Sequence, residues 1–374
     1  MPLLMKNRFS LIYFFILFAL TIALAFKPGY NWDMLPYMAI TEKIDGVKPF
    51  DKIHTDVYNN AKENLSSKRY HSLTDTANAY RKKMFEDADA FQTQLPFFNI
   101  KPVYLISVYI FYKLGAALTY ATIIPSLIAF LCMNVLAYFW CRRFKLSFPA
   151  LIIALMLVCV ITIPFATRSN PDGLAFLFAL AGAFFFLETE NLFIAVLFLI
   201  LSILTRPDYI IFALLLYTIV LIGKWKRKVP FFISSLYLLL LLLSYYLPLK
   251  IMSNPGWSTL FFHAFINNTA NPAAKQTVTI PLYLKVINHN ILTAKGIAAF
   301  AFLVLLSLPV LWFKRIQSKN SALYKLFFIV VVVWAITKFL LFPMGSLRFL
   351  IPPFLLMVFV EIKEYELTQS KKLV

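Results

Sequence analysis

Long apolar runs constrain this chain more than any other feature of its sequence. A transmembrane helix needs about 20 apolar residues to cross a hydrocarbon core about 30 Å thick. The composition fits such a protein, because 61% of the residues are hydrophobic and only 14% are charged, against about 25% in a soluble domain. We therefore predict an all-α polytopic membrane protein of about ten transmembrane helices. The runs lie near residues 9–26, 119–140, 148–166, 172–187, 190–205, 208–223, 230–248, 296–313, 322–342 and 347–361.

Five clusters of basic residues indicate how these helices are oriented. With ten spans all five clusters fall on one side, and an excess of Lys and Arg marks the cytoplasmic side. We therefore expect a multi-pass protein of the cytoplasmic (inner) membrane with both termini cytoplasmic. An excess of basic residues in a membrane protein usually marks its cytoplasmic loops, so the formal net charge of +19 does not indicate a nucleic-acid partner, and we expect none. The five clusters comprise Lys6 with Arg8, residues 141–145, 224–228 and 313–319, and Lys371 with Lys372.

The sequence divides into three parts. Residues 1–26 form the first transmembrane helix; a cleaved signal peptide ending near Ala25 is the alternative. Residues 27–118 form a long, helical extracytoplasmic loop that carries ten of the seventeen acidic residues. Residues 119–374 form the transmembrane bundle, with a second outer loop at 249–295. The apolar stretch 101–118 is interpreted as an interfacial or re-entrant helix, because a crossing there would move the 141–145 basic cluster outside.

Charged residues at the outer ends of the predicted spans are the first candidates for a functional site. Arg168 lies near Asp172, and Arg206 near Asp208, whereas Arg348 has no acidic neighbour in the sequence. Guanidinium groups bind phosphate in a fixed two-pronged geometry, so arginines at this depth could hold a lipid-linked phosphate. The alternative is that each one extends to the interface or pairs with its local aspartate.

Asp33, in the stretch "GYNWDMLPYMA", stands where the first run meets the long loop. A carboxylate beside hydrocarbon is costly, and such residues are often functional. Asp33 could act as a general base on an acceptor hydroxyl or amine. It could instead be the N-cap of a helix that begins at Met34.

Cofactor and disulfide chemistry find little support. Asp87 and Asp89 could contribute to a divalent-metal site, but a solvated helix face explains them better, and no clear set of metal ligands emerges. The three cysteines lie in or beside apolar runs, where we expect no disulfide. No glycine-rich phosphate loop or serine-nucleophile motif is present.

The order of these features resembles that of the GT-C glycosyltransferases, in the branch of protein O-mannosyltransferases and the lipid A aminoarabinose transferase. Asp33 with Tyr37 matches the acidic motif and tyrosine that open the first loop. "KPVYLISVYIFYKLG" matches a Lys-Pro-Pro-Leu-like motif, with Val103 replacing the second proline. Asp172 matches an aspartate after the third span. The pair Arg206–Pro207 and the late segment "RFLIPPFLL" also have counterparts.

The resemblance implies an integral membrane enzyme that transfers a sugar from a polyprenyl-phosphate donor to an envelope glycan, lipid or protein on the outer face of the membrane. Asp33 would be the base and Asp172 would orient a neighbouring group. The remaining implied site residues would bind the donor phosphate, namely Lys101, Arg168, Arg206 and Arg348, or the substrate, namely Tyr37 and Tyr104. Met34 stands where the family often has a second acid, which weakens the case for a shared metal.

Two other functions remain open. A transporter or flippase for a lipid-linked or anionic substrate would place charges at the membrane midplane. A polymerase or ligase of lipid-linked saccharides would use the same phosphate chemistry, with its reactive loop late in the chain, for which 249–295 is suitable.

Overall fold

The computed structural model describes residues 3–75, 78–144, 146–223, 225, 228–267, 271, 274–293, 297, 319–343 and 347–372. Within these residues every regular element is a helix, which confirms the predicted all-α class. The first half of the chain contains α1 (Leu3–Ala25), α2 (Met34–Ile44), α3 (Phe50–Asn64), α4 (Ser67–Leu73), α5 (Ala79–Glu86), α6 (Ala88–Gln92), η1 (Leu95–Phe97), α7 (Pro102–Lys113), α8 (Leu118–Ala121), α9 (Ile124–Arg143), α10 (Phe148–Ala166) and α11 (Asp172–Phe184). The second half contains η2 (Phe185–Thr189), α12 (Leu192–Thr205), η3 (Pro207–Tyr209), α13 (Ile210–Leu221), α14 (Phe231–Ile251), α15 (Trp257–Phe265), α16 (Ile280–Leu292), α18 (Lys319–Leu341) and α19 (Leu347–Lys372).

Six stretches among the described residues are long and apolar enough to cross a membrane. Their outward surfaces are rich in exposed Leu, Ile, Phe and Val side chains, as expected where lipid replaces water. The chain is therefore a polytopic helical membrane protein. The six stretches are Arg8–Ala25, Leu118–Arg143, Phe148–Ala166, Asp172–Thr189, Phe231–Ile251 and Ala322–Leu341.

These six correspond to six of the ten predicted spans. The runs 190–205 and 208–223 form α12 and α13, which have 14 and 12 residues and are shorter than the roughly 20 residues of a full crossing. The run 347–361 lies within the longer helix α19. The run 296–313 falls, apart from residue 297, outside the described residues. The predicted total of ten spans thus stays a prediction.

The segment between α1 and α9 has a hydrophobic core of its own. α2 is buried along almost its whole length and packs against α3 and α7. Met34, Val57, Phe91 and Tyr104 are among the fully buried side chains of this core. α7 has 12 residues, about 18 Å at the helical rise, which is too short to cross the hydrocarbon core.

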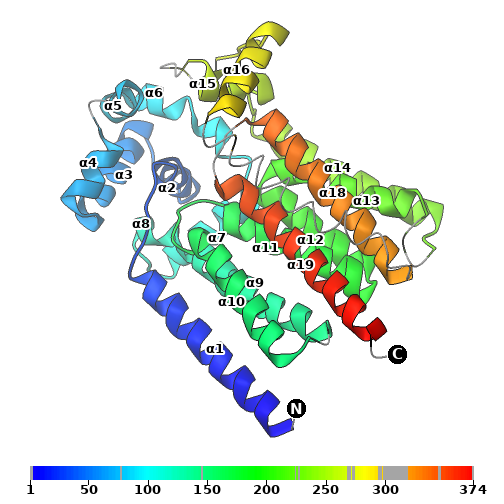
Figure 1. Cartoon of the computed structure of the whole chain (residues 1–374). Coiled ribbons are helices and arrows are strands. Elements are labelled where there is room, and N and C mark those ends of the chain that lie inside the picture. The colour runs from blue at the N-terminus through cyan, green and yellow to red at the C-terminus, as the bar shows by residue number, and fades with distance from the viewer. Residues whose placement is uncertain are drawn as a thin grey trace.

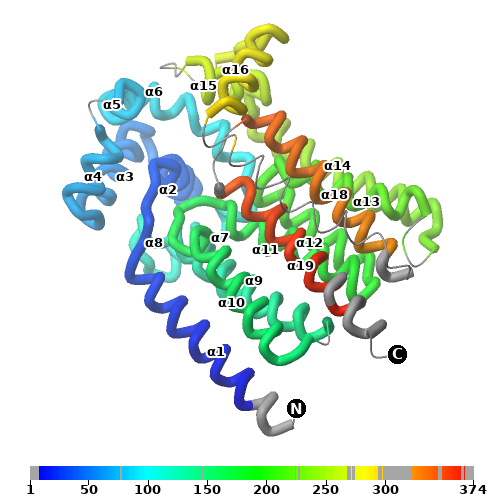
Figure 2. The backbone as a smooth tube through the Cα atoms, viewed as in Figure 1, coloured from blue at the N-terminus to red at the C-terminus, as the bar shows by residue number. Residues whose placement is uncertain are grey.

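The two ends of the bundle differ. Both chain termini lie at one end, and α2–α6 together with α15 and α16 lie at the other (Figure 1). Figure 2 shows the chain passing from the far end of α1 directly into α2. We call the end that carries α2–α6 the loop end and the opposite end the terminal end.

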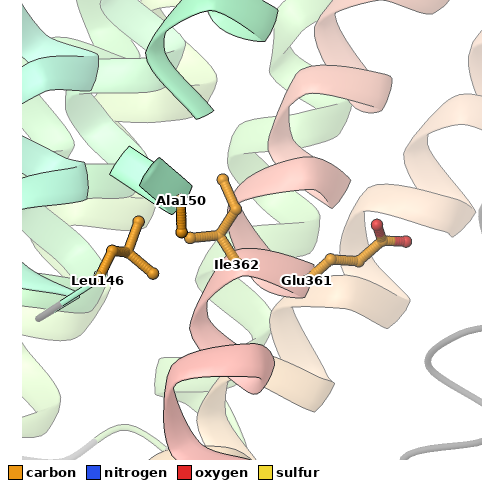
Figure 3. A pocket seen from close by; sticks show the side chains of 4 residues that line it. All are labelled: Leu146, Ala150, Glu361 and Ile362. Atoms are coloured by element: carbon orange, nitrogen blue, oxygen red, sulfur yellow. The ribbon is translucent and has the colours of Figure 1, made fainter. Parts of the chain in front are cut away.

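At the terminal end, Glu188 is held by the fold and is not the simple solvated turn that its sequence context suggests. Its carboxylate accepts hydrogen bonds from the Trp140 indole and the Tyr324 hydroxyl. Beside α10 and α19 lies a small pocket of about 190 Å³. Figure 3 shows the Glu361 carboxylate pointing away from the other side chains that line it, Leu146, Ala150 and Ile362, which leaves an apolar hollow.

Candidate functional site

Charged side chains from helix ends that are distant in sequence meet at the loop end. We call this group the charged cluster. It forms because each member stands at or next to a helix terminus, where the chain leaves the apolar interior. Its members are Asp33 and Lys101 at the N-caps of α2 and α7, Arg168 and Asp172 at the start of α11, Arg206 and Asp208 between α12 and α13, Lys338 near the end of α18, and Arg348 at the start of α19.

Arg206 is the centre of the cluster's ion pairs. Its Nε lies 2.8 Å from Asp208 Oδ1, and its Nη1 donates to Asp172 Oδ1. Lys338 Nζ lies 3.1 Å from the other oxygen of Asp208. Because the Arg206 side chain is only 17% exposed, these contacts compensate a charge that is largely removed from water.

Arg348 joins the two carboxylates that the sequence singled out. Its Nη1 lies 3.8 Å from Asp33 Oδ2, and its Nε lies 3.8 Å from Asp172 Oδ2. The two aspartates differ in access, because the Asp33 side chain is 33% exposed and that of Asp172 only 6%. Asp33 is therefore the more accessible of the two carboxylates, and Asp172 is the more enclosed.

Backbone contacts hold the two halves of the site together. The Gly29 amide donates to the Thr167 carbonyl at 2.7 Å, which ties the chain before Asp33 to the turn before Asp172. A Cβ at Gly29 would lie 3.1 Å from that carbonyl oxygen, so a larger residue would fit only if the neighbouring backbone shifted by a few tenths of an ångström. The Ser126 hydroxyl donates to the Arg168 carbonyl at 2.7 Å and fixes the same turn on α9.

The alternative of helix capping by Asp33 is not supported by the geometry. Asp33 does occupy the N-cap position of α2, but its backbone is already helical (φ −56°, ψ −19°) and its side chain makes no capping hydrogen bond. A capping aspartate has a non-helical backbone and accepts from an amide two or three residues on. The Asp33 carboxylate is instead the ion-pair partner of Arg348.

Lys101 and Tyr37 form a second polar contact within the cluster. Lys101 Nζ donates to the Tyr37 hydroxyl at 2.7 Å and lies 4.7 Å from the centre of the Phe98 ring. Burial, reinforced by the positive charge of Arg206, lowers the pKa of Lys101 from 10.5 to about 7. Tyr104 packs against Tyr37, but its own hydroxyl donates to the Thr122 carbonyl at 2.6 Å, so it supports the site from within the fold.

Buried polar atoms without partners gather next to the cluster. Twelve such side-chain atoms occur among the described residues, and five belong to the residues that flank Asp33 and Arg168. Buried polar groups normally have hydrogen-bond partners, so a concentration of unpaired ones calls for an explanation. Buried water or a polar ligand would satisfy them. The five atoms are Asn31 Oδ1, Trp32 Nε1, Ser169 Oγ, Asn170 Nδ2 and Asp172 Oδ2.

The cluster has more cations than carboxylates. Five basic side chains and three carboxylates meet there, a formal surplus of two positive charges when Lys101 is protonated. Among the described residues, Lys101 and Arg168 make no ion pair with a carboxylate, whereas the other three cations do. Because buried charges are stable only when they are compensated, an anion is the ligand that suits this site.

The structure brings together every predicted site residue, but with different partners. Asp172 pairs with Arg206 and Arg348 and not with its sequence neighbour Arg168. Sequence reasoning missed Lys338, a member of the cluster, and Phe349, which packs against it. Lys338 stands in the apolar run "WAITKFLLF", a context that is typical of a lysine whose side chain extends to the membrane interface. Phe349, whose ring lies 4.7 Å from the Arg348 guanidinium carbon, carries no signal in a chain with 39 phenylalanines.

No group of three or more His, Cys, Asp or Glu side chains suited to hold a metal ion occurs among the described residues. Asp87, one of the two aspartates considered for a metal, caps α6, because its carboxylate accepts from the Ala90 amide at 2.9 Å. It also pairs with Lys83 at 2.6 Å.

Comparisons with protein-family models, with curated proteins and with solved structures found no match to this chain.

Proposed function

We propose that this protein is a membrane glycosyltransferase that transfers a sugar from a polyprenyl-phosphate donor to an envelope glycan, lipid or protein. The observation that carries the proposal is the pairing of an accessible carboxylate with a cationic surplus. Asp33 lies 3.8 Å from Arg348, inside a cluster that holds two more cations than carboxylates. Transfer from a phosphate ester requires both a base and a site for the departing anion.

The cationic half of the cluster supports binding of the donor phosphate. Arg168 and Lys101 are free of carboxylate partners among the described residues, and Arg348 makes two long ion pairs of 3.8 Å. A phosphate dianion could replace these weak contacts with short, two-pronged ones. Arg206, fixed by Asp172 and Asp208, would contribute its charge without moving.

The carboxylate half supports deprotonation of the acceptor. Asp33 would take the proton from an acceptor hydroxyl or amine, whose oxygen or nitrogen attacks the anomeric carbon of the sugar. The bond from that carbon to the phosphate oxygen breaks, and the electron pair leaves with polyprenyl phosphate. The attack inverts the configuration at the anomeric carbon. The nearby arginines stabilise the negative charge that grows on the leaving phosphate.

The unpaired polar atoms around the cluster support a sugar as the transferred group. Asn31 offers an acceptor oxygen, and Trp32 and Asn170 offer N–H donors, none of which has a hydrogen-bond partner among the described residues. Sugar hydroxyls both donate and accept, so they could satisfy a mixed set of this kind. A simple anion such as phosphate would use only the donors.

The position of the charges argues against the transporter alternative. Transporters place charged binding residues near the membrane midplane, often beside interrupted helices. Here Arg206, Asp208 and Lys338 stand at or near helix ends at the loop end, and the Lys363–Glu366 pair lies beyond the apolar run 347–361. Buried polar side chains along the spans, such as Asn134 and Thr162, hydrogen-bond to each other.

The experiment that tests the proposal compares envelope glycans and polyprenyl-phosphate sugars, by mass spectrometry, in a strain with the gene and a strain without it. We expect a lipid-linked sugar to accumulate in the deletion strain while one glycan residue disappears. Restoring the gene should reverse both changes. Unchanged glycans together with an unchanged lipid-linked pool would contradict the proposal.

A further inference from the structure

Helix α16 exposes an apolar stripe at the loop end. Ile280, Leu284 and Leu292 are 75%, 55% and 68% exposed. On the helical wheel these side chains lie within about one third of the circumference, on a side that also contains exposed Asn288. Val286, on the opposite side of α16, and Ile287, next to Ile280 on the helical wheel, are buried. A stripe of this size that faces water would be unfavourable, so it marks a contact surface.

Two aromatic hydrogen bonds fix α16 at the depth where a span ends. The Tyr283 hydroxyl donates to the Leu340 carbonyl at 2.8 Å. Trp257, from the neighbouring helix α15, donates through its indole N–H to the Leu341 carbonyl at 2.8 Å. Leu341 is the last residue of the Ala322–Leu341 span. Tyr and Trp are enriched at this boundary because one part of each ring system is apolar and the other is polar.

The apolar stripe continues the lipid-facing surface of that span. Ile336 and Leu340 on α18 are 42% and 41% exposed. The Leu340 carbonyl also accepts the hydrogen bond from Tyr283 of α16. On the helical wheel of α16, exposed Lys285 and His289 stand at the edge of the stripe. Basic residues that border an apolar face are typical of helices that lie in the membrane interface.

We propose that α16 lies on the membrane surface, with Ile280, Leu284 and Leu292 inserted at the boundary between headgroups and acyl chains and Lys285 directed to lipid phosphates. Its partner is the lipid of the leaflet that contains the end of α18. The inference is independent of the transfer reaction, because it rests only on the position and the exposed face of α16.

Aromatic contacts connect α16 to the charged cluster, so membrane contact by α16 would help to hold the segment between them in place. α15 and α16 touch through Trp257 and Tyr283, whose ring centres are 6.0 Å apart. From α15 the contacts run from Phe265 to Phe342 at 4.7 Å, and from Phe342 to Phe349 at 6.0 Å. Phe349 lies beneath the Arg348 and Arg206 guanidinium groups. Membrane docking would thus hold the second outer segment beside the site.

The test measures the depth of position 284 in the full chain. Cys132, Cys141 and Cys159 are replaced by alanine, and an environment-sensitive fluorophore is attached to Leu284→Cys. The protein is reconstituted in vesicles of phosphatidylcholine and phosphatidylglycerol that contain lipids with a nitroxide quencher either near the headgroup or deep in the acyl chain. We expect blue-shifted emission and stronger quenching by the shallow nitroxide.

Two labelled positions calibrate the result. Leu239→Cys, exposed on the α14 span, should be quenched more by the deep nitroxide, and Lys52→Cys, exposed on α3, by neither. If position 284 behaves like position 52, the proposal is wrong.

Photo-cross-linking tests the same proposal in the chain with its natural cysteines. A photoreactive benzophenone residue at position 284 should cross-link to phospholipid, and one at position 52 should not. Equal cross-linking at both positions would overturn the proposal.

Discussion

At the scale of single residues, Asp172 explains why the site could be only partly predicted. Its sequence neighbour Arg168 is the obvious partner, yet the carboxylate pairs with Arg206 and Arg348, 34 and 176 positions away. Local spacing identified the correct residue types at helix ends. It could not identify the partners, because those depend on which helix ends meet in the folded bundle.

Arg206 and Arg168 should differ in their contribution to stability. Arg206→Ala leaves Asp172 and Asp208 without their main counter-charge, and removal of one partner of a buried ion pair costs about 3–5 kcal/mol. Arg168→Ala removes a cation that pairs with no carboxylate in the described chain, and should change the free energy of unfolding by less than about 0.5 kcal/mol. Thermal unfolding of the purified protein in detergent compares the two variants, and equal losses would contradict the ion-pair assignment.

Lys101 should give donor use a dependence on pH. Burial lowers its pKa to about 7 in the folded protein, so the ammonium loses its proton, and the site one positive charge, as the pH rises through about 7. We expect kcat/KM for the anionic donor to fall over this range, since that ratio reports groups of the free enzyme. Lys101→Arg keeps its charge and should flatten the profile; an unchanged profile in this variant would exclude Lys101 as the cause.

At the scale of elements, a single glycine determines how the first loop meets the bundle. Gly29 approaches Thr167 so closely that a Cβ would lie 3.1 Å from the carbonyl oxygen and 3.3 Å from Oγ1. The sequence "KPGYNWD" suggests a turn there, but it gives no indication that the turn docks on a segment about 140 residues away. Such docking contacts are tertiary, and no local periodicity encodes them.

Gly29→Ala should therefore move Asp33 relative to Asp172 and Arg348. The added Cβ requires a backbone shift of a few tenths of an ångström, and because misplaced reacting groups lower a catalysed rate, we expect a measurable loss of transfer with only a modest loss of stability. Lys27→Ala, an exposed change two residues earlier, is the matched control and should transfer normally. Initial rates of the two variants at saturating donor check this, and an active Gly29→Ala enzyme would show that the approach is not needed.

At the scale of the whole molecule, the hydrophobic pattern predicted the class of fold, whereas the number of spans stays a prediction. Runs of 18 or more apolar residues, such as 148–166, became helices of spanning length. The shorter runs became α12 and α13, each of which buries one face against neighbouring helices. Length alone cannot distinguish a short span supported by its neighbours from a helix that stops within the membrane.

The arrangement of the two ends gives the molecule its polarity. Both termini and the Glu188 contacts lie at the terminal end, whereas the charged cluster lies at the loop end (Figure 1). The basic clusters predict that the terminal end is cytoplasmic. The proposed reaction would then occur on the outer face, where a lipid-linked donor is needed because nucleotide sugars are in the cytoplasm.

The most direct test of the central proposal is sugar transfer by the reconstituted Asp33→Asn variant. Asparagine keeps the size of the side chain but cannot accept the acceptor's proton, so transfer from the polyprenyl-phosphate donor should fall by about 100-fold or more, with unchanged thermal stability. Asp45→Asn, which removes a surface carboxylate paired with Lys113, should transfer at the normal rate. Near wild-type transfer by Asp33→Asn would contradict the assignment of Asp33 as the base.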